Sequence, residues 1–169
     1  MKAKRVALLG LLTAIALTIF LLEAQLPPVV PIPGVKLGLA NIVTVFAVFA
    51  LGAWEGAAVL VCRVFLGAVF AGNFSSVLYS AAGGLCAILA TVGAKRVLKE
   101  NQLWAAGCLG AVAHSVGQLL AAVAVTRTAA ALSLLPVLVI ISMFTGLFTG
   151  LCAQFLVKRG GKRWKTIFS

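Results

Sequence analysis

The sequence is poor in acidic residues: it contains no aspartate, and its three glutamates are Glu23, Glu55 and Glu100. Magnesium ions in proteins are bound mainly by clustered carboxylate oxygens. Because the three glutamates fall on different segments, no cluster of this kind is expected. A phosphate-binding loop of the GxxxxGK[ST] kind is also missing from the sequence, so any ATP hydrolysis has to come from a partner.

Other metal-ligating residues are few as well. The chain has one histidine, His114, with no carboxylate near it, and four cysteines without a CxxC spacing. All four cysteines lie inside apolar segments, where we expect them to be small buried apolar residues. We therefore predict no metal site, no cofactor and no disulfide framework. The cysteines are Cys62, Cys86, Cys108 and Cys152.

Charged residues make up only 10% of the chain, whereas 63% of it is hydrophobic and the mean hydropathy is +1.17. Soluble domains are about one quarter charged, so this composition excludes a soluble domain and indicates an integral membrane protein in contact with lipid. A net charge of +11 would suggest nucleic-acid binding in a soluble chain. Here the basic residues lie mostly between and after apolar segments, which fits membrane topology better. No nucleic-acid partner is expected.

The apolar segments predict an all-α, polytopic bundle of about six transmembrane helices. A helix needs about 20 residues to cross roughly 30 Å of hydrocarbon, so the second and third segments are short. Their separation rests on GAWEG, residues 52–56, where two glycines, Trp54 and Glu55 interrupt the apolar run. No repeat or second domain is visible, and residues 1–169 are interpreted as a single transmembrane domain. The predicted spans are about 6–26, 37–53, 54–72, 75–94, 103–126 and 131–157.

Lysine and arginine orient the predicted bundle, because short loops rich in these residues stay in the cytoplasm. With six spans, both basic termini and the basic loop at 95–99 face the cytoplasmic side of the plasma membrane, and only Lys36 and Arg127 lie outside. Five spans would place one basic terminus outside. The beginning MKAKR also resembles a signal peptide. A first membrane span is favoured, because the apolar run to Leu22 is long and no clear cleavage site follows it.

Four of the five prolines fall in PPVVPIPGVK, residues 27–36, which joins the first two predicted spans on the outer side. Proline removes backbone donors and favours an extended course. The segment is therefore predicted to be a stiff lid over a pocket, with Lys36 at the mouth of the bundle. A rigid spacer or an anchor for lipid phosphate is the alternative.

Polar residues at membrane depth indicate where such a pocket lies, because an ionisable group there usually faces a cavity or a partner. Arg63 is midway along the third predicted span and His114 midway along the fifth. Gly110, His114 and Gln118 are one turn apart and share a helix face. Interhelical packing is the alternative for His114 and Gln118, and snorkelling or a structural pair with Glu23 is the alternative for Arg63.

Positive charge beside an apolar cavity lowers the cost of binding a negative group. Lys36 and Arg63 therefore favour an anionic or partly anionic ligand. Glu23, near the outer end of the first predicted span, is positioned to pair with either cation.

Small residues recur along the first predicted helix at Ala3, Ala7, Gly10, Ala14 and Thr18. Such a stripe lets another helix approach closely. It predicts either ordinary packing inside the bundle or a docking face for a separate membrane protein. The sixth segment carries a similar ridge, formed by Ser142, Gly146 and Gly150.

Four stretches resemble one family: PIPGVKLGLANIVTVFAV, RVFLGAVFAG, GAVAHSVGQLLAA and TGLFTGLCAQFLVKR. They are similar to the Gx transporter family, whose members are often labelled heptaprenyl diphosphate synthase component I. These proteins are similar to the substrate-binding S components of energy-coupling factor transporters, which are six-helix membrane bundles. The resemblance runs nearly end to end.

The resemblance implies a small-molecule ligand captured near the outer face, under the loop between the first two helices. It also implies that small residues on the first helix dock onto a transmembrane coupling protein driven by two cytoplasmic ATPases. By this analogy the docking positions are Ala7, Gly10 and Ala14, where glycine stands in for part of an alanine-rich pattern. The ligand-side candidates are Lys36, Asn41, Arg63, His114 and Gln118, with Glu23 beside them.

The synthase label suggests a second function, that of a membrane accessory of polyprenyl diphosphate or quinone biosynthesis. Prenyl chain elongation needs diphosphates held by magnesium. Because the chain lacks aspartate and its glutamates are dispersed, catalysis by this chain alone is not expected. The transport subunit is the favoured prediction, and the biosynthetic accessory is the alternative.

Overall fold

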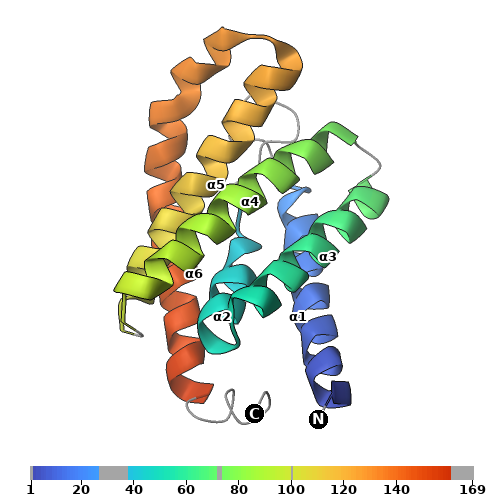
Figure 1. Cartoon of the computed structure of the whole chain (residues 1–169). Coiled ribbons are helices and arrows are strands. Elements are labelled where there is room, and N and C mark those ends of the chain that lie inside the picture. The colour runs from blue at the N-terminus through green and yellow to red at the C-terminus, as the bar shows by residue number, and fades with distance from the viewer. Residues whose placement is uncertain (1, 27–37, 72–73, 100, 161–169) are drawn as a thin grey trace.

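Figure 1 shows the computed structural model of the chain, a bundle of helices packed side by side. The structure describes residues 2–26, 38–71, 74–99 and 101–160. No strand occurs in these ranges, which confirms the predicted all-α class. The helices are α1 (Lys2–Glu23), α2 (Asn41–Ala50), α3 (Ala53–Ala71), α4 (Phe74–Val97), α5 (Leu103–Thr126), the 3-10 helix η1 (Ala129–Leu134) and α6 (Leu135–Gly160).

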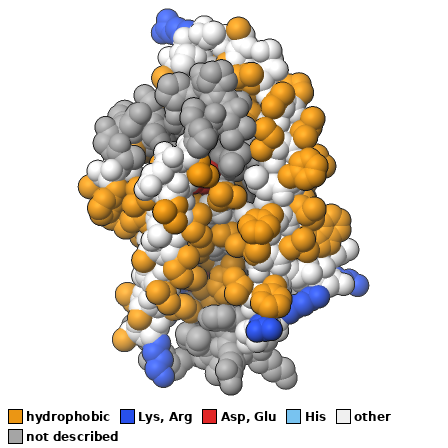
Figure 2. Space-filling model, turned by 180° about the vertical axis from the view of Figure 1, so that it is seen from behind, with side chains coloured by type: hydrophobic (Ala, Val, Ile, Leu, Met, Phe, Trp, Pro, Cys, Tyr) orange, Lys and Arg blue, Asp and Glu red, His pale blue; other side chains and the backbone are white. Residues whose placement is uncertain are grey.

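The outer surface of the bundle is apolar, as lipid requires. Five helices, α1, α3, α4, α5 and the helical stretch that ends with α6, are long and apolar enough to cross a membrane. Large apolar side chains such as Phe65, Phe144 and Phe148 are exposed on their outer faces. Figure 2 shows hydrophobic side chains over the flank of the molecule and basic side chains toward its ends. The chain is a multi-pass membrane protein.

The second predicted span differs from the expectation. The structure places only ten residues, Asn41–Ala50, in helix α2. At 1.5 Å per residue this helix is about 15 Å long, roughly half of the hydrocarbon thickness. The prediction of about six helices is confirmed, but a full-length helix over 37–53 is wrong. Gly38, with φ of +79°, lies in a turn before α2, and this left-handed conformation suits glycine and prevents an earlier helical start.

The turn predicted at GAWEG is present. Helix α2 ends at Ala50, and α3 begins at Ala53, only two residues later. Gly52 has φ of +152°, a backbone conformation that residues other than glycine rarely adopt. The separation of the second and third helices is therefore encoded locally, by one glycine.

Helix α2 is the centre of the bundle. It contacts each of the other five α-helices, and all of its residues except Ile42 are buried. Its apolar residues, among them Val45, Ala47 and Val48, form the middle of the main hydrophobic core. The half-length helix is surrounded by protein, so its N-terminal end at membrane depth is shielded from lipid.

Helices α5 and α6 pack backbone against backbone. A Cβ atom added to Gly107 would lie 2.3 Å from the carbonyl oxygen of Gly146, and one added to Gly150 would lie 2.7 Å from that of Leu103. The hydroxyls of Ser115 and Ser142 form a buried hydrogen bond of 2.5 Å across the same interface. The predicted ridge on the sixth helix therefore packs inside the chain's own bundle, as small-residue ridges in membranes usually do.

Most of the described basic residues lie at one end of the molecule. The first turns of α1 and the last turns of α6 are at the same end in Figure 1. At this end Arg5 of α1 pairs with Glu55 of α3, and Lys95 of α4 donates to the carbonyl of Val48 at the end of α2. Arg127, after α5, lies at the opposite end, which matches the predicted distribution of charge.

The cysteines differ in part from the expectation. All four are free thiols. Cys62 is exposed and the other three are partly exposed, so the prediction that they are buried is wrong. In a membrane bundle both the interior and the lipid are apolar, so a thiol is tolerated on either side and its sequence context does not distinguish them.

Candidate functional site

The buried end of α1 is joined to the beginning of α2 through Glu23. Its carboxylate accepts hydrogen bonds from the backbone N–H groups of Gly38, at 2.6 Å, and Leu39, at 3.0 Å. Glu23 is 6% exposed although it carries an ionisable group. The backbone N–H of Asn41 in turn donates to the carbonyl of Gly38 at 2.9 Å. The carboxylate thus holds the turn that starts α2.

His114 of α5 lies directly beneath this turn. A Cβ atom added to Gly38 would be 2.9 Å from Cδ2 of His114, so only glycine allows the turn to approach the imidazole this closely. On its other side the ring meets α4, because a Cβ atom on Gly83 would lie 3.0 Å from Cε1 of His114. The same added Cβ atom on Gly83 would lie 2.6 Å from Cγ of Gln118. The two glycines therefore fix the position of the imidazole.

Arg63 of α3 is the cation of the site. It is 4% exposed, and it lies ten residues, or about 15 Å, from the start of α3, near the middle of the hydrocarbon thickness. Its guanidinium lies over the ring of Phe20, 5.7 Å from the centroid. Arg63 interacts electrostatically with both Glu23 and His114. The structure thus brings together residues from three helices that the sequence analysis proposed as one site.

Asn41, the first residue of α2, extends this group of side chains toward α4 and α5. A Cβ atom on Gly110 would lie 3.1 Å from Nδ2 of Asn41 and 2.8 Å from Oγ1 of Thr91. Gly110 thus leaves room for the amide of Asn41 beside α5. We call Glu23, Asn41, Arg63, His114 and Gln118 the polar cluster. All five are buried.

Several buried polar atoms in and beside the cluster have no hydrogen-bond partner among the described residues. Within the described ranges, four buried side-chain atoms lack a hydrogen bond: Nδ2 of Asn41, Oγ1 of Thr44, Nε of Arg63 and Nδ1 of His114. Leaving one such group unsatisfied costs about 1–3 kcal/mol, and native structures keep few of them. Four such atoms around one short helix leave hydrogen-bonding capacity that water or a ligand can satisfy.

The chemistry of these atoms is that of a donor site. The amide of Asn41 and the guanidinium of Arg63 can only donate through the atoms concerned, and the imidazole nitrogen and the threonine hydroxyl can donate or accept. Among the described residues, no group of three or more histidine, cysteine, aspartate or glutamate side chains is placed to hold a metal ion. The donor atoms are suited to holding a ligand with acceptor oxygens.

Two predicted features fall outside the described residues. Lys36 and the proline-rich segment 27–36 lie in the range 27–37, so the lid and its cation stay predictions. Gly38 and Leu39, which directly follow this range, are the first described residues above the cluster. The predicted pairing of Glu23 with Arg63 also stays a prediction.

The sequence analysis missed two residues near the cluster. Thr44 is completely buried one turn after Asn41, and Thr91 is completely buried on α4 opposite Gly110. A threonine in an apolar helix usually bonds to its own backbone, as Thr91 does with the carbonyl of Ala87 at 2.8 Å. The spacing of Thr44 three residues after Asn41 was the available signal, since both residues then lie on one helix face.

The predicted docking residues lie on the outside. Ala7, Gly10 and Ala14 are exposed along α1, and a Cβ atom on Gly10 would meet nothing within 4 Å. Gly10 and Ala14 line a shallow groove of about 460 Å³ between α1 and α3. The stripe is therefore not used for packing within the described part of the bundle, unlike the ridge on α6.

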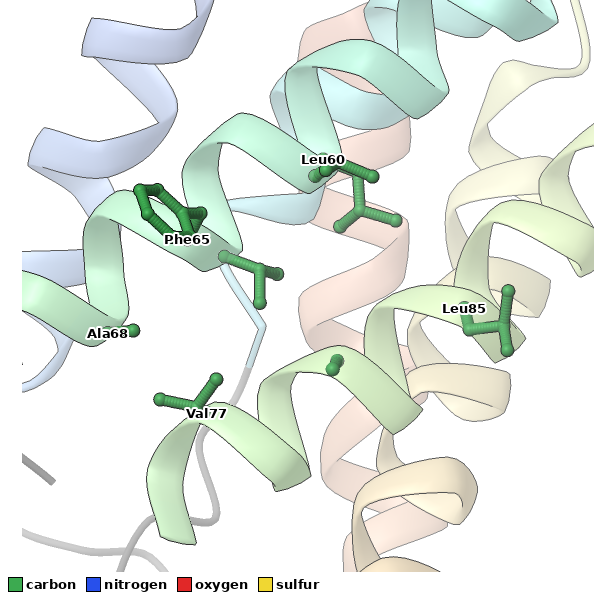
Figure 3. Close-up of a pocket in the computed structure, with 8 residues that line it drawn as sticks. Leu60, Phe65, Ala68, Val77 and Leu85 are labelled. Atoms are coloured by element: carbon green, nitrogen blue, oxygen red, sulfur yellow. The ribbon is translucent and has the colours of Figure 1, made fainter. Parts of the chain in front are cut away.

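A second surface groove lies between α3 and α4. Its volume is about 430 Å³, and Figure 3 shows Leu60, Phe65, Ala68, Val77 and Leu85 around it. Every residue that lines it is apolar, and none belongs to the polar cluster. A groove of this composition on a lipid-facing surface is suited to hydrocarbon chains, so it does not provide the polar contacts that a charged ligand needs.

The fold and the cluster together define a polytopic α-helical membrane protein with a buried polar site at the start of a half-length central helix. The family model described as heptaprenyl diphosphate synthase component I matches residues 12–156, so the chain belongs to this family. The match includes α2 to α5 and all described members of the polar cluster. Searches among curated proteins and among solved structures give no match.

Proposed function

We propose that the chain is an integral membrane subunit that binds a small, anionic or partly anionic metabolite for uptake into the cell. The observation that carries this proposal is the polar cluster: a buried arginine and several unpartnered donor atoms at membrane depth. Such groups are costly in hydrocarbon, and in transport proteins they mark the path or the site of the substrate. The resemblance to transport S components supports the same conclusion.

We further propose that energy comes from separate proteins. The sequence has no phosphate-binding loop, so a transmembrane coupling protein with cytoplasmic ATPases has to supply it. The exposed stripe formed by Ala7, Gly10 and Ala14 is the candidate contact, since small residues permit close helix approach. In this arrangement the basic end of the bundle faces the cytoplasm of the cell and both termini lie there.

The direct test is to identify what the protein retains. Protein extracted from its native membrane with mild detergent is expected to carry a compound with a carboxylate or phosphate group. Mass spectrometry of the denatured sample identifies the compound, and equilibrium titration of the emptied protein then gives its affinity. A protein that retains nothing and binds none of a panel of anionic metabolites would contradict the proposal.

The family description favours one alternative, an accessory role in polyprenyl diphosphate or quinone biosynthesis. Magnesium-dependent chemistry by this chain finds little support in the structure. Glu55 pairs with Arg5, whereas Glu23 lies about 27 Å farther along α1, so these two carboxylates cannot share a metal ion. Glu100 lies outside the described residues.

The two functions differ in what a gene deletion changes. Under the transport proposal, deletion is expected to leave the pools of polyprenyl diphosphates and quinones unchanged when the medium supplies the end products of metabolism. Quantification of both pools by mass spectrometry provides the measurement. A specific fall in heptaprenyl diphosphate that the restored gene reverses would support the accessory role instead.

A further inference from the structure

We infer that the carboxylate of Glu23 is a built-in competitor of the ligand, occupying the position that the ligand's anionic group takes at the start of α2. This inference rests on the proposed function, because it concerns the same polar cluster. It adds which atoms receive the anion and what has to leave before it binds.

The first observation is the location of the N-terminal end of α2. This helix begins inside the bundle, enclosed by the other five α-helices. A helix N-terminus carries a partial positive charge, and half-length helices in transporters commonly direct this end at an anionic group of the substrate. In this protein the two N–H groups just before the helix, from Gly38 and Leu39, already hold a carboxylate, at 2.6 and 3.0 Å.

The second observation is the set of unpartnered donors around the start of α2. Arg63 interacts electrostatically with Glu23, yet its Nε has no hydrogen-bond partner among the described residues. Nδ2 of Asn41, two residues after Leu39, is likewise without one. Both side chains are 4% exposed. The site therefore has more donor capacity than the Glu23 carboxylate uses, as expected of a site that also accepts a larger group with several oxygens.

The charges decide how the site is filled. A ligand anion that binds the same two N–H groups would lie beside the Glu23 carboxylate, so that two negative groups would be in contact. Uncompensated charge at this depth is strongly unfavourable. The carboxylate therefore has to turn away from the two N–H groups or take up a proton when the ligand binds. The apparent affinity is then the intrinsic affinity multiplied by the fraction of molecules in which the carboxylate has moved away, so a small fraction means weak binding.

The test replaces the competitor with a neutral isostere. Glu23→Gln keeps an oxygen that accepts from Gly38 and Leu39 but removes the negative charge. With inorganic phosphate as the probe, we expect this variant to bind at least tenfold more tightly than the wild-type protein. Equilibrium dialysis of labelled phosphate against protein in detergent measures the dissociation constant. Phosphate-dependent shifts of the unfolding temperature provide a second readout.

Glu55→Gln is the matched control. Glu55 is nearly as buried as Glu23, but it pairs with Arg5 at the basic end of the bundle. Neutralising it changes the net charge by the same amount, so phosphate binding is expected to stay at the wild-type level. If Glu23→Gln does not fold, Glu23→Ala serves instead. It removes both the charge and the acceptor oxygens from the two N–H groups, and tighter phosphate binding is again expected.

Phosphate binding by Glu23→Gln that is absent, or no tighter than that of the wild-type protein, would overturn the inference. Weaker binding would do so as well, because it would make the carboxylate a contact of the ligand rather than its competitor. These outcomes leave the proposed function standing, since that proposal is judged separately, by the retained compound and its dependence on Arg63.

Discussion

Gly107→Leu is expected to prevent α5 and α6 from packing, so that little monodisperse protein is recovered in detergent. A Cβ atom at this position would lie 2.3 Å from the carbonyl oxygen of Gly146 and 2.6 Å from the Cα of Gly150. Both neighbours are backbone atoms, which cannot rotate away as a flexible side chain can. Overpacking a core usually costs 1–3 kcal/mol and occasionally more. Because two helix backbones are in direct contact at this position, we expect the substitution to reduce stability by at least about 3 kcal/mol.

The close approach of these helices is the main source of their association. In a membrane the hydrophobic effect does not drive helices together, because lipid is as apolar as leucine, and close van der Waals contact has to replace it. The hydrogen bond between Ser115 and Ser142 depends on the same short separation. A larger residue at position 107 therefore removes the contacts and the hydrogen bond together.

Gly93→Leu is the control for this experiment. Gly93 lies on α4 in an exposed position, and a Cβ atom there would meet nothing within 4 Å. The variant adds the same side chain to a helix but places it toward lipid. Size-exclusion chromatography and thermal unfolding in the same detergent compare the two proteins. Equal recovery and equal unfolding temperatures would show that the interface tolerates expansion, contrary to the geometry.

The long helices could be predicted from the sequence because each depends on a local property. Apolar stretches of about 20 residues need no information about distant contacts to be recognised as spans. The turn at Gly52 was also predictable, since GAWEG interrupts the apolar run. The prediction of α2 failed because its 17-residue apolar segment reads like a span, whereas residues 38–40 form a turn held by Glu23. That contact joins residues far apart in sequence.

The polar cluster could be predicted in composition but not in geometry. Arg63, His114 and Gln118 were identifiable because polar side chains are rare in this chain and costly in a membrane. Which of their atoms stay unpartnered depends on the neighbouring helices. The approach of Gly38 to His114, for example, requires two segments separated by several helices. The exposed side of α1 was equally ambiguous, since a stripe of small residues fits packing and docking alike.

Arg63→Gln is expected to weaken binding of the retained compound roughly 100-fold, a difference of about 2.8 kcal/mol. Arg63 is the buried cation of the polar cluster, and a charged hydrogen bond in a site shielded from water contributes more than a neutral one. The matched variant is Arg127→Gln, which removes an exposed cation at the end of α5. Its affinity is expected to stay within a factor of two of the wild-type value. Isothermal titration with the identified compound, after the retained compound has been removed, measures the affinities of the wild-type protein and of both variants.

Loss of Arg63 also removes a buried cation that interacts with Glu23, and removing one member of a buried set of charges lowers stability. Weak binding by Arg63→Gln alone could therefore reflect partial unfolding. The double variant Glu23→Gln, Arg63→Gln removes both charges. It is expected to reverse most of the decrease in unfolding temperature that Arg63→Gln causes. It is not expected to recover binding, because the cation that attracts the anionic group is still missing. Recovery of binding together with stability would show that Arg63 serves only to balance Glu23, and the ligand would then have to be held elsewhere.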